Sequence, residues 1–345
     1  MTAHPAQELR DRAMQLGPGP EAMRLLEMAF SLAFMENVAL PFACKIGDVN
    51  LASPAHALLR IAKGGIVVAF MQGVEKTPAL GLKMFPLFAR LFAACAANLA
   101  AGEARQIVVN FSDGCETEGD YRRVSFSCSK PDTILVPDYH FANSNGYAEL
   151  RRQGSKPWRQ RQDRLFWRGT SSGRLLPGRS GRWDWHQRVH LCHLAQISRH
   201  SARLDIGMAD HDAILDPARK QQIEAQGFLR PRVPMEIFRN YRYLVDVDGF
   251  SNSWLLLEKL TMGATLLKIG SGFGYRQWYY GRLEPWVHYI PVAPDLSDFE
   301  DRLDWMFAHE EECERIAANG AALAAELTWD GEFQDAVDRL STALG

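Results

Sequence analysis

Apolar runs that read as buried strands alternate along this chain with segments of helical periodicity. Seven runs have the strand pattern: 65–70, 107–111, 133–136, 165–167, 243–247, 265–269 and 287–292. Helical patterns cover residues 87–100, 185–198 and 253–262, and another begins at residue 297 with the capping-box sequence Ser-Asp-Phe-Glu. Several strand runs are apolar at every position, as in parallel strands that are buried on both faces. The alternation predicts an α/β fold.

The length of 345 residues, with 47% hydrophobic and 23% charged residues, is typical of a globular protein of two domains. The polar segment 151–163, which contains glycine and proline, is the best candidate for a hinge between them. We therefore predict an N-terminal domain over 1–155, a second domain over 156–325, and a terminal helix over 326–345 that could pack back on the first. The sequence shows neither a signal peptide nor an apolar run of about 18 residues, which predicts a cytoplasmic location.

A basic segment spans residues 151–190. It contains eleven Lys or Arg and only two acids, although the formal net charge of the whole chain is −2. Such a run is commonly a solvated surface, but it also suits the wall of a cleft for a phosphate-rich ligand. Arg168 favours the cleft, because it follows the apolar run 165–167 and precedes Gly169 and a Ser/Thr loop, as at the ligand-binding end of a strand. Arg188 falls in the next helical pattern and could reach the same cleft.

Small and polar residues follow the strand at 243–247 and open the next helix: Asp248, Gly249, Ser251, Asn252 and Ser253. Free backbone N–H groups and the helix dipole at such a start favour an anion, so a diphosphate fits, with Gly249 permitting the tight turn. Lys259, one to two turns along the helix, could add a positive charge. The alternative is an ordinary Ser/Asn N-cap with no ligand.

Three further motifs are weaker. Asp246-Val247-Asp248 matches the DxD pattern of metal-dependent sugar-nucleotide enzymes, but only by two residues. Gly270 to Gly274 lacks the GxGxxG spacing and is interpreted as a loop. His186, His190 and His193 share one helix face, but a metal site would need a further ligand from another element, so structural histidines are favoured.

Several longer sequence motifs resemble those of a known protein family. Arg168-Gly169, the turn LVDVDGFSNSW, and above all LEPWVHYIPVAPDLSDFEDRLDW followed by ERIAANG resemble glycosyltransferase family 90, over about residues 160–325. The resemblance implies a GT-B fold, in which two Rossmann-like domains face a central cleft and the C-terminal domain holds a nucleotide-sugar. It also implies inversion at the anomeric carbon without a metal. We therefore expect a UDP-sugar as co-substrate, no cofactor, and no metal at Asp246 and Asp248.

The resemblance also points to a catalytic base. The family's glucosyltransferases have a strand that ends in Val-Asn, then two residues, then a catalytic Asp, and Val109-Asn110-Phe111-Ser112-Asp113 has this pattern. Inverting transfer needs a carboxylate that takes the proton of the acceptor hydroxyl as its oxygen attacks C1. Asp113 is the expected base, and the cations and the turn named above would stabilise the leaving diphosphate. From the residues alone, Asp113 before Gly114 is also typical of an Asx turn.

Two details concern the donor and the acceptor. Animal relatives have an arginine that contacts the diphosphate where this chain has Leu255, and Lys259, on the same helix face, is the candidate replacement. The aromatic segment 136–147 would contact the acceptor, with Tyr139 and Phe141 packing against sugar rings. The alternative for this segment is a packed loop without a ligand.

Together these features predict a bacterial glycosyltransferase that moves glucose or xylose from a UDP-sugar to a hydroxyl of a lipopolysaccharide, capsule or other surface glycan. Its partners would be the donor and a glycan or glycolipid acceptor, the latter met at the inner face of the membrane, and not nucleic acid. The alternative is a non-catalytic polyanion-binding protein that uses the basic segment 151–190. Steeply salt-dependent DNA binding without nucleotide-sugar hydrolysis would select that alternative.

Overall fold

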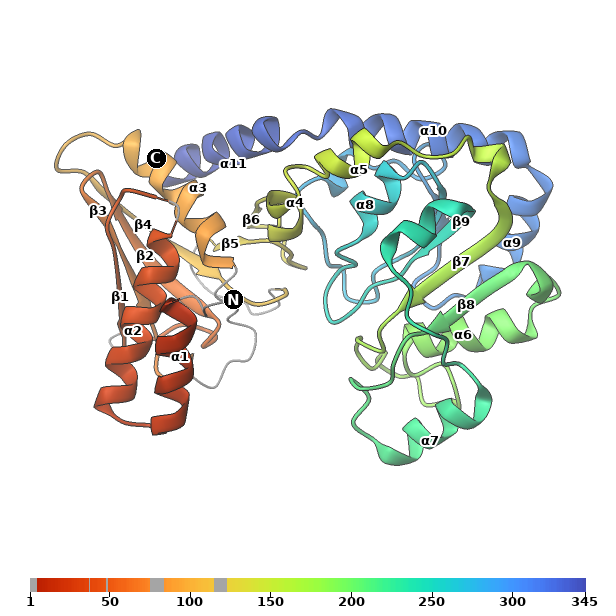
Figure 1. Cartoon of the computed structure of the whole chain (residues 1–345), viewed down its shortest axis with the longest axis horizontal. Coiled ribbons are helices and arrows are strands. Elements are labelled where there is room, and N and C mark those ends of the chain that lie inside the picture. The colour runs from red at the N-terminus through yellow and green to blue at the C-terminus, as the bar shows by residue number, and fades with distance from the viewer. Residues whose placement is uncertain (1–4, 37, 48, 75–83, 115–122) are drawn as a thin grey trace. The chain divides into compact units, whose positions relative to one another are not determined.

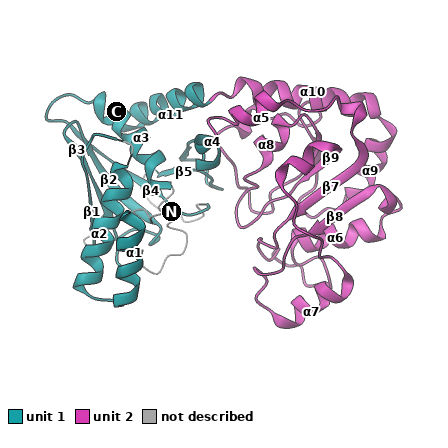
Figure 2. Ribbon diagram, viewed as in Figure 1, with its two compact units in different colours: residues 1–143, 329–345 teal, residues 144–328 magenta. Residues whose placement is uncertain are grey.

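The computed structural model describes residues 5–36, 38–47, 49–74, 84–114 and 123–345. The chain divides into two compact units (Figure 2), unit 1 with residues 1–143 and 329–345 and unit 2 with residues 144–328. Each unit has its own sheet and its own helices, so the predicted α/β class is confirmed. Among the described residues, no helix combines the length and apolar character needed to cross a bilayer.

Unit 1 is built on a mixed six-stranded sheet in the order β1-β3-β2-β4-β5-β6 (Figure 1). Its strands are β1 Phe42–Ile46, β2 His56–Ala62, β3 Gly65–Phe70, β4 Ala104–Asn110, β5 Arg123–Ser125 and β6 Thr133–Leu135. The other pairs are parallel, but β2 runs antiparallel to both β3 and β4. Strands β1, β2 and β5 were not predicted, because they are short or carry a basic residue within an apolar run. The two-residue connection Lys63-Gly64 closes the β2–β3 hairpin.

Phenylalanines fill the core between the sheet and the helices of unit 1. The helices are α1 Pro5–Leu16, α2 Pro20–Met35, α3 Phe85–Ala97, α4 Tyr139–Asn143 and α11 Trp329–Leu344. Phe34 on α2 stacks on Phe85 of α3 at 4.4 Å between ring centroids, and Phe85 meets Phe111, just after β4, at 5.0 Å. All three rings are buried, and burying each stabilises the unit by about 1.5–3 kcal/mol. This packing holds the end of β4, where the expected base lies, against two helices.

The last helix, α11, belongs to unit 1 although unit 2 precedes it in the chain. The guanidinium of Arg90 on α3 lies 5.0 Å from the ring centroid of Trp329, and Phe141 on α4 approaches the same ring at 6.2 Å. Arg339 donates a hydrogen bond to the carbonyl oxygen of Leu135 at 3.1 Å. The C-terminal segment therefore completes the core of the first unit.

Unit 2 contains a five-stranded sheet in the order β11-β10-β9-β7-β8, with every pair parallel. The strands are β7 Gln162–Gly169, β8 Leu204–Met208, β9 Tyr241–Asp246, β10 Thr265–Ile269 and β11 Ile290–Val292. The α- and 3-10 helices are α5 Ala148–Gln153, η3 Trp158–Gln160, α6 Gln187–Ile197, η4 Ser201–Arg203, α7 Pro217–Gln226, η5 Met235–Asn240, α8 Leu256–Thr261, η6 Tyr280–Arg282, α9 Phe299–Ala308 and α10 Glu310–Glu326. All five residues of β10 are buried, as the continuous apolar run predicted. Strand β8 was not predicted, because an Asp and a Gly interrupt its apolar residues.

The predicted hinge at 151–163 is wrong, and the first unit ends at residue 143 instead of residue 155. This segment packs within unit 2. Arg151 donates to the carbonyl oxygen of Ala324 at 2.6 Å and so satisfies the end of α10. Trp158 is buried, and its indole N–H donates to Thr265 Oγ1 at 3.1 Å. Polarity alone suggested a linker, but these side chains have partners that only the fold supplies.

The predicted capping box at the start of α9 is also wrong. Ser297 Oγ donates to Asp295 Oδ1 at 2.7 Å, and α9 has no side-chain cap. Asp298 Oδ1 accepts from the backbone N–H of Ala293 at 2.8 Å. These polar residues stabilise the loop before the helix and not its first turn.

Candidate active site

The strand order of unit 2 reverses direction at β7. The chain passes from β7 to β8 on one side, then crosses to β9 on the other side before it continues to β10 and β11. In open parallel sheets, ligands bind at the carboxyl ends of the two strands that flank such a reversal. The topology therefore points to the loop after β7, residues 170–173, and the turn after β9, residues 247–253.

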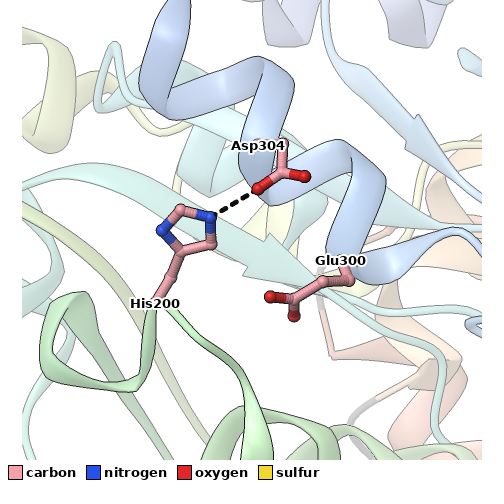
Figure 3. Close-up of side chains that lie close together, drawn as sticks. All are labelled: His200, Glu300 and Asp304. Atoms are coloured by element: carbon pink, nitrogen blue, oxygen red, sulfur yellow. Dashed lines mark hydrogen bonds and ion pairs between the residues drawn. The ribbon is translucent and has the colours of Figure 1, made fainter.

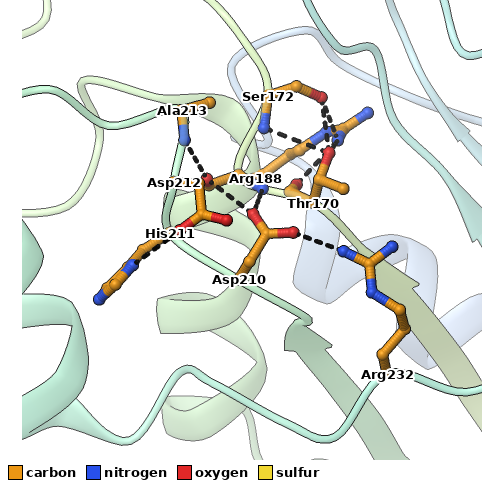
Figure 4. A network of polar contacts seen from close by, with 9 residues as sticks. Thr170, Ser172, Arg188, Asp210, His211, Asp212, Ala213 and Arg232 are labelled. Atoms are coloured by element: carbon orange, nitrogen blue, oxygen red, sulfur yellow. Dashed lines mark hydrogen bonds and ion pairs between the residues drawn. The ribbon is translucent and has the colours of Figure 1, made fainter.

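Arg188, on α6, joins these two segments. It is buried, and its Nε donates to the carbonyl oxygen of Asp248 at 2.9 Å while Nη2 donates to that of Val247 at 3.2 Å. On the other side, Nη1 donates to the Thr170 carbonyl oxygen and to Ser172 Oγ, both at 2.8 Å (Figure 4). Burial lowers the pKa of Arg188 to about 10, so it remains charged at neutral pH. Because the protein itself uses most of its N–H groups, we interpret Arg188 as a residue that positions both segments and not as the predicted diphosphate ligand.

A second network fixes the loop after β7 against the loop after β8 (Figure 4). The backbone N–H and the hydroxyl of Ser171 both donate to Asp210 Oδ1 at 3.2 Å. Ser171 Oγ accepts from the N–H of Ala213 at 3.2 Å, and Arg232 donates to Asp210 Oδ2 at 2.9 Å. The loop beside the strand reversal is thus held in one conformation by its neighbours.

The two glycines predicted at the donor site are required by close packing. A Cβ on Gly249 would lie 3.1 Å from Ser172 Oγ and 3.2 Å from Arg188 Nη2. Gly249 does not have a positive φ, so the turn that it was expected to permit does not use the special freedom of glycine. The close approach of Ser172 and of the Arg188 guanidinium explains this glycine instead. At Gly169, the last residue of β7, a Cβ would lie 2.5 Å from an atom of the Trp167 ring.

Three buried side chains in the turn after β9 keep polar atoms without a partner among the described residues. Asp248 is 6% exposed, and Ser251 and Asn252 are each 2% exposed. Asp248 Oδ1 accepts from the N–H of Ser253 at 3.1 Å, but Asp248 Oδ2, Ser251 Oγ and both polar atoms of the Asn252 amide have no partner. Leaving such an atom unpaired costs about 1–3 kcal/mol. Their concentration in one turn at the strand reversal indicates a place where a ligand supplies the missing hydrogen bonds.

The two acids of the DxD pattern have opposite environments. Asp246 Oδ1 accepts from Ser253 Oγ at 2.5 Å and from Lys259 Nζ at 2.9 Å, and Oδ2 lies 3.4 Å from Lys268 Nζ. Burial disfavours the charged form of Asp246, but the two ammonium groups outweigh it and hold its pKa below the usual range. Burial raises the pKa of Asp248, and Lys268 offsets this only in part. Because both oxygens of Asp246 face cations, the pair does not fit a divalent metal.

Lys259 does not replace the arginine that is missing at Leu255. It is buried, and its Nζ donates to the carbonyl oxygen of Val245 and to Asp246 Oδ1, each at 2.9 Å. Its charge is therefore neutralised inside the unit and is not directed toward a diphosphate. The predicted donor contact from Lys259 is wrong for this reason.

The expected helix start at Ser251 to Ser253 is also wrong. Helix α8 begins at Leu256 and has six residues, so the turn precedes it by several positions. The dipole of so short a helix is too weak to favour an anion at this turn. Instead, side-chain polar groups carry the evidence for a ligand at this turn.

Arg168 has structural partners in the place where a ligand was predicted. Its Nη2 donates to Asp205 Oδ1 at 2.5 Å and its Nη1 to the Asp205 carbonyl oxygen at 3.0 Å. The guanidinium lies 4.9 Å from the ring centroid of Phe166. Arg168 thus ties β7 to the beginning of β8, and a diphosphate would have to compete with an ion pair. Its role as a donor ligand stays a prediction that this geometry does not favour.

In unit 1, Asn110 shapes the turn that carries Asp113. Asn110 is buried at the end of β4, its Nδ2 donates to Ser125 Oγ at 3.0 Å, and its Oδ1 accepts from the backbone N–H of Ser112 at 3.2 Å and from Ser112 Oγ at 2.7 Å. Ser112 Oγ also lies 2.8 Å from the carbonyl oxygen of Gly114. These bonds build an Asx turn in which Asn110, and not Asp113 as the sequence also allowed, accepts the hydrogen bond. The turn leaves the Asp113 side chain exposed, as a base that must reach an acceptor hydroxyl requires.

The two predicted acceptor residues lie on α4 but differ in burial. Phe141 is fully buried and packs against Trp329, so the prediction that it contacts an acceptor is wrong. Tyr139 is half-buried, with its ring 6.4 Å from that of Phe126 and 4.1 Å from that of His140. Only Tyr139 has the exposure that contact with an acceptor needs.

We expect these two residues to separate in a stability and kinetics experiment. Phe141→Ala should lower the free energy of unfolding of unit 1 by about 3–5 kcal/mol, because it leaves a cavity beside Trp329. Tyr139→Ala loses ring contacts with Phe126 and His140, so it should lower the melting temperature, but less than Phe141→Ala does, and it should raise the KM for the acceptor. Thermal denaturation of both variants and acceptor titration of Tyr139→Ala measure this. An unchanged acceptor KM in Tyr139→Ala would leave α4 with a purely structural role.

The histidines and acids that the structure describes do not assemble a convincing metal site. Within the described part of the chain, the only cluster of His, Cys, Asp and Glu at ligating distances is His200, Glu300 and Asp304 (Figure 3). His200 lies 2.7 Å from Asp304, and Arg199 forms ion pairs with both carboxylates. The guanidinium already supplies the positive charge, so we interpret the cluster as a surface ion-pair network. His186, buried beside Gly173 at the start of α6, has its pKa lowered to about 4 by burial and by Arg188, and it remains neutral.

Several residues that shape this site were not predicted. Lys268 was hidden within an apolar strand run, and its side chain reaches Asp246 only because β9 and β10 pair with these two residues in register. Asn110 belongs to the motif Val109 to Asp113, but the sequence alone gave no role to its side chain. The signal that could have found both is a polar residue inside or at the end of an otherwise apolar strand.

Comparisons with known proteins identify the family of the chain. The family model described as "Glycosyl transferase family 90" matches residues 134–331, which is more than half of the chain. Protein O-glucosyltransferase 2 of Danio rerio is 29% identical over 167 residues, which cover 48% of this chain and 29% of that protein. Protein O-glucosyltransferase 3 of Homo sapiens is 24% identical over 205 residues, or 56% of this chain and 36% of that protein. The chain therefore spans well under half the length of these relatives.

Solved structures with some similarity include an Anabaena HepE protein in complex with UDP-glucose, at 15% identity and a TM-score of 0.35, covering 57% of this chain and 52% of that one. Sucrose-phosphate synthase from Thermosynechococcus elongatus has 10% identity and a TM-score of 0.40, with 94% of each chain covered. Both units are α/β, the second on an open parallel sheet, in agreement with the predicted fold class. The matched family model covers the strand reversal, the turn after β9 and the PWVHYIPV string, and the chain belongs to glycosyl transferase family 90.

Proposed function

We propose that this protein is an inverting, metal-independent glycosyltransferase that moves a sugar, glucose or xylose, from a UDP-sugar to a hydroxyl of a surface-glycan acceptor such as a lipopolysaccharide or capsule precursor. The proposed donor site rests on one observation: Asp248, Ser251 and Asn252 have buried polar atoms without a partner at the strand reversal of unit 2. These are neutral or hydrogen-bonding groups, which suit the hydroxyls and amides of a nucleotide-sugar. Family membership and glucosyltransferases among the relatives support the reaction class.

In this mechanism, Asp113 takes the proton of the acceptor hydroxyl while the oxygen forms its bond to C1 and the bond from C1 to the UDP oxygen breaks. The rigid segments after β7 and β9 position the donor, held together by Arg188. UDP leaves as an anion and inversion follows from attack on the face opposite the leaving group.

Asn252 provides a test of the donor site. In the free protein its amide has no partner, so Asn252→Ala should not lower the melting temperature and could raise it. The same change should remove most of the thermal stabilisation by UDP-sugars, because a ligand stabilises only in proportion to its affinity. Thermal shifts with UDP, UDP-glucose, UDP-xylose, GDP and CMP, on the wild type and on Asn252→Ala, measure both effects.

A matched control is Asn145→Ala, which removes an amide from another loop of unit 2 that precedes β7. It should leave the ligand-induced shifts unchanged. If the wild type gains no stability from any of these nucleotides, or if Asn252→Ala gains as much as the wild type, the turn after β9 is not the donor site.

Transfer should survive chelation with EDTA. The physical reason is that Lys259 and Lys268 already neutralise Asp246, so the DxD pattern has no free carboxylate pair for a cation. Activity before and after EDTA treatment, followed by addition of Mn²⁺, measures this. Complete loss that Mn²⁺ restores would show that the metal-independent mechanism is wrong.

The second candidate, polyanion binding through residues 151–190, gains no support from this segment. Arg151 is bound to carbonyl oxygens of α10, and ion pairs hold Arg159 to Glu314 and Arg168 to Asp205. A cation that already has a carboxylate or carbonyl partner contributes little to the binding of a polyanion. The run therefore combines cations that hold unit 2 together with exposed ones, such as Arg152, Lys156 and Arg164, that lie on its surface.

A further inference from the structure

Unit 2 has a pocket of about 420 Å³ at the amino-terminal edge of its sheet, between α9, α10 and the loop before β11. It is lined by Trp286, Arg302, Trp305, Glu312, Arg315 and Ile316. The loop before a parallel strand lies at the edge opposite the one where the turn after β9 lies. The pocket is therefore separate from the proposed donor site, and the PWVHYIPV string that contains Trp286 has no role there.

The conformation of Trp286 is the first reason to expect a ligand. Its φ is 66°, in the left-handed region that bulky residues rarely adopt, and its side chain is 39% exposed. The loop enforces this conformation: the N–H of Trp286 donates to the Tyr289 carbonyl oxygen at 2.7 Å, and the N–H of Glu284 donates to His288 Nδ1 at 2.9 Å. Core packing does not explain a strained residue whose indole stays in solvent. Strain of this kind is retained where a side chain must be presented to something else.

The shape and chemistry of the pocket are the second reason. The rings of Trp286 and Trp305 lie 4.8 Å apart at 72°, edge to face, and both line the pocket, while His309 stacks on one face of Trp305 at 4.7 Å. Arg302 is fixed over Trp286 at 5.0 Å and paired with Asp298 at 2.8 Å. These contacts hold the indole in place, so its orientation does not depend on a ligand.

The polar wall comes from α10. Glu312 and Arg315 are one turn apart and make no ion pair or hydrogen bond with another described residue. A carboxylate and a guanidinium that line the same pocket offer acceptors and donors together, which suits the vicinal hydroxyls of a sugar. The aromatic walls suit its apolar C–H face. A phosphate group would be repelled by Glu312, and a simple cation by Arg315.

We propose that this pocket is a second, non-catalytic saccharide site that binds a sugar ring of a glycan on the opposite edge of unit 2 from the donor turn. The site goes beyond the proposed transfer reaction and does not depend on it. The site would hold a glycan through one of its sugar units, at a distance from the hydroxyl that receives the transferred sugar. Binding to one such site is expected to be weak, with a Kd of about 1–10 mM, and to gain strength on an oligosaccharide through multivalency.

The test uses the full chain labelled with 5-fluorotryptophan and titrated with methyl β-glucopyranoside, followed by ¹⁹F NMR. The resonances of Trp286 and Trp305, assigned by Trp→Phe substitution, should shift, while that of Trp254, the residue that follows the turn after β9, should not. Glu312→Gln should weaken binding about tenfold, the loss of roughly one strong hydrogen-bonding partner. Glu311→Gln, which changes an exposed acid on the same helix outside the pocket, should bind like the wild type.

Two results would overturn the inference: no movement of the Trp286 and Trp305 resonances with methyl β-glucopyranoside, methyl β-xylopyranoside or methyl glucuronide, or equal weakening by Glu312→Gln and Glu311→Gln. UDP added to the same sample reports on the donor site through Trp254. Failure of the donor site and failure of the second site are therefore distinguishable in one experiment.

Discussion

Asp113→Asn should reduce the rate of sugar transfer by about 10²–10⁴-fold, the usual contribution of a general base. The amide cannot accept the proton of the attacking hydroxyl, but it keeps the size and most of the hydrogen-bonding shape of the carboxylate. Because the base acts on the acceptor, the affinity for UDP should hardly change. Single-turnover transfer and calorimetric titration with UDP measure the two quantities on the same preparation.

The matched control is Asp132→Asn, an exposed acid of unit 1 just before β6. It changes the charge of the unit equally and should leave both rate and affinity unaltered. Near-normal turnover in Asp113→Asn would remove Asp113 from the mechanism. A second pair of variants tests whether Asn110 positions Asp113. If Asn110→Ala lowers the transfer rate and Asn110→Asp restores most of it, the Asx turn at Asn110 presents the base.

Arg188→Lys should have the second-largest effect. The arginine bonds the carbonyl oxygens of Val247, Asp248 and Thr170 through three nitrogens, and a lysine ammonium cannot span these positions. We expect the free energy of unfolding to fall by about 2–4 kcal/mol as buried carbonyl groups lose their donors. We also expect the KM for UDP-glucose to rise about tenfold or more, because the segments after β7 and β9 are no longer held in register.

The kinetic measurement separates positioning from a general loss of stability. At a temperature well below the midpoint of unfolding, a variant that is only less stable would keep the wild-type KM. Arg182→Lys, at an exposed position on the same stretch of chain, is the matched control and should retain both the KM and the stability. If Arg188→Lys binds UDP-glucose as tightly as the wild type, Arg188 serves folding alone.

The balance of buried charge explains why the cations predicted at the donor site bind groups of the protein itself. Arg168, Arg188 and Lys259 were chosen because cations near a strand end suit a diphosphate. In the structure, each cation has an acceptor that lies far away in the sequence: Asp205, the carbonyl oxygens of the turn, and Asp246. A buried charge must be paired, and the sequence does not say with what. Asp248, Ser251 and Asn252, in contrast, were predicted and remain as the groups whose partners are missing.

The sequence by itself determined the α/β class, the parallel strands of unit 2 and the place of the polar turn after β9, because these follow from local patterns: continuous apolar runs, their spacing, and small polar residues at a strand end. It also determined the family, through strings such as PWVHYIPV. Only the tertiary structure decided that β2 runs antiparallel and that residues 144–155 belong to unit 2. It alone decided which polar groups are satisfied, because hydrogen bonds and ion pairs join residues such as Arg188 and Asp248 that are distant along the chain. Local pattern specifies the elements, but the partner of a buried polar group is a property of the packed fold.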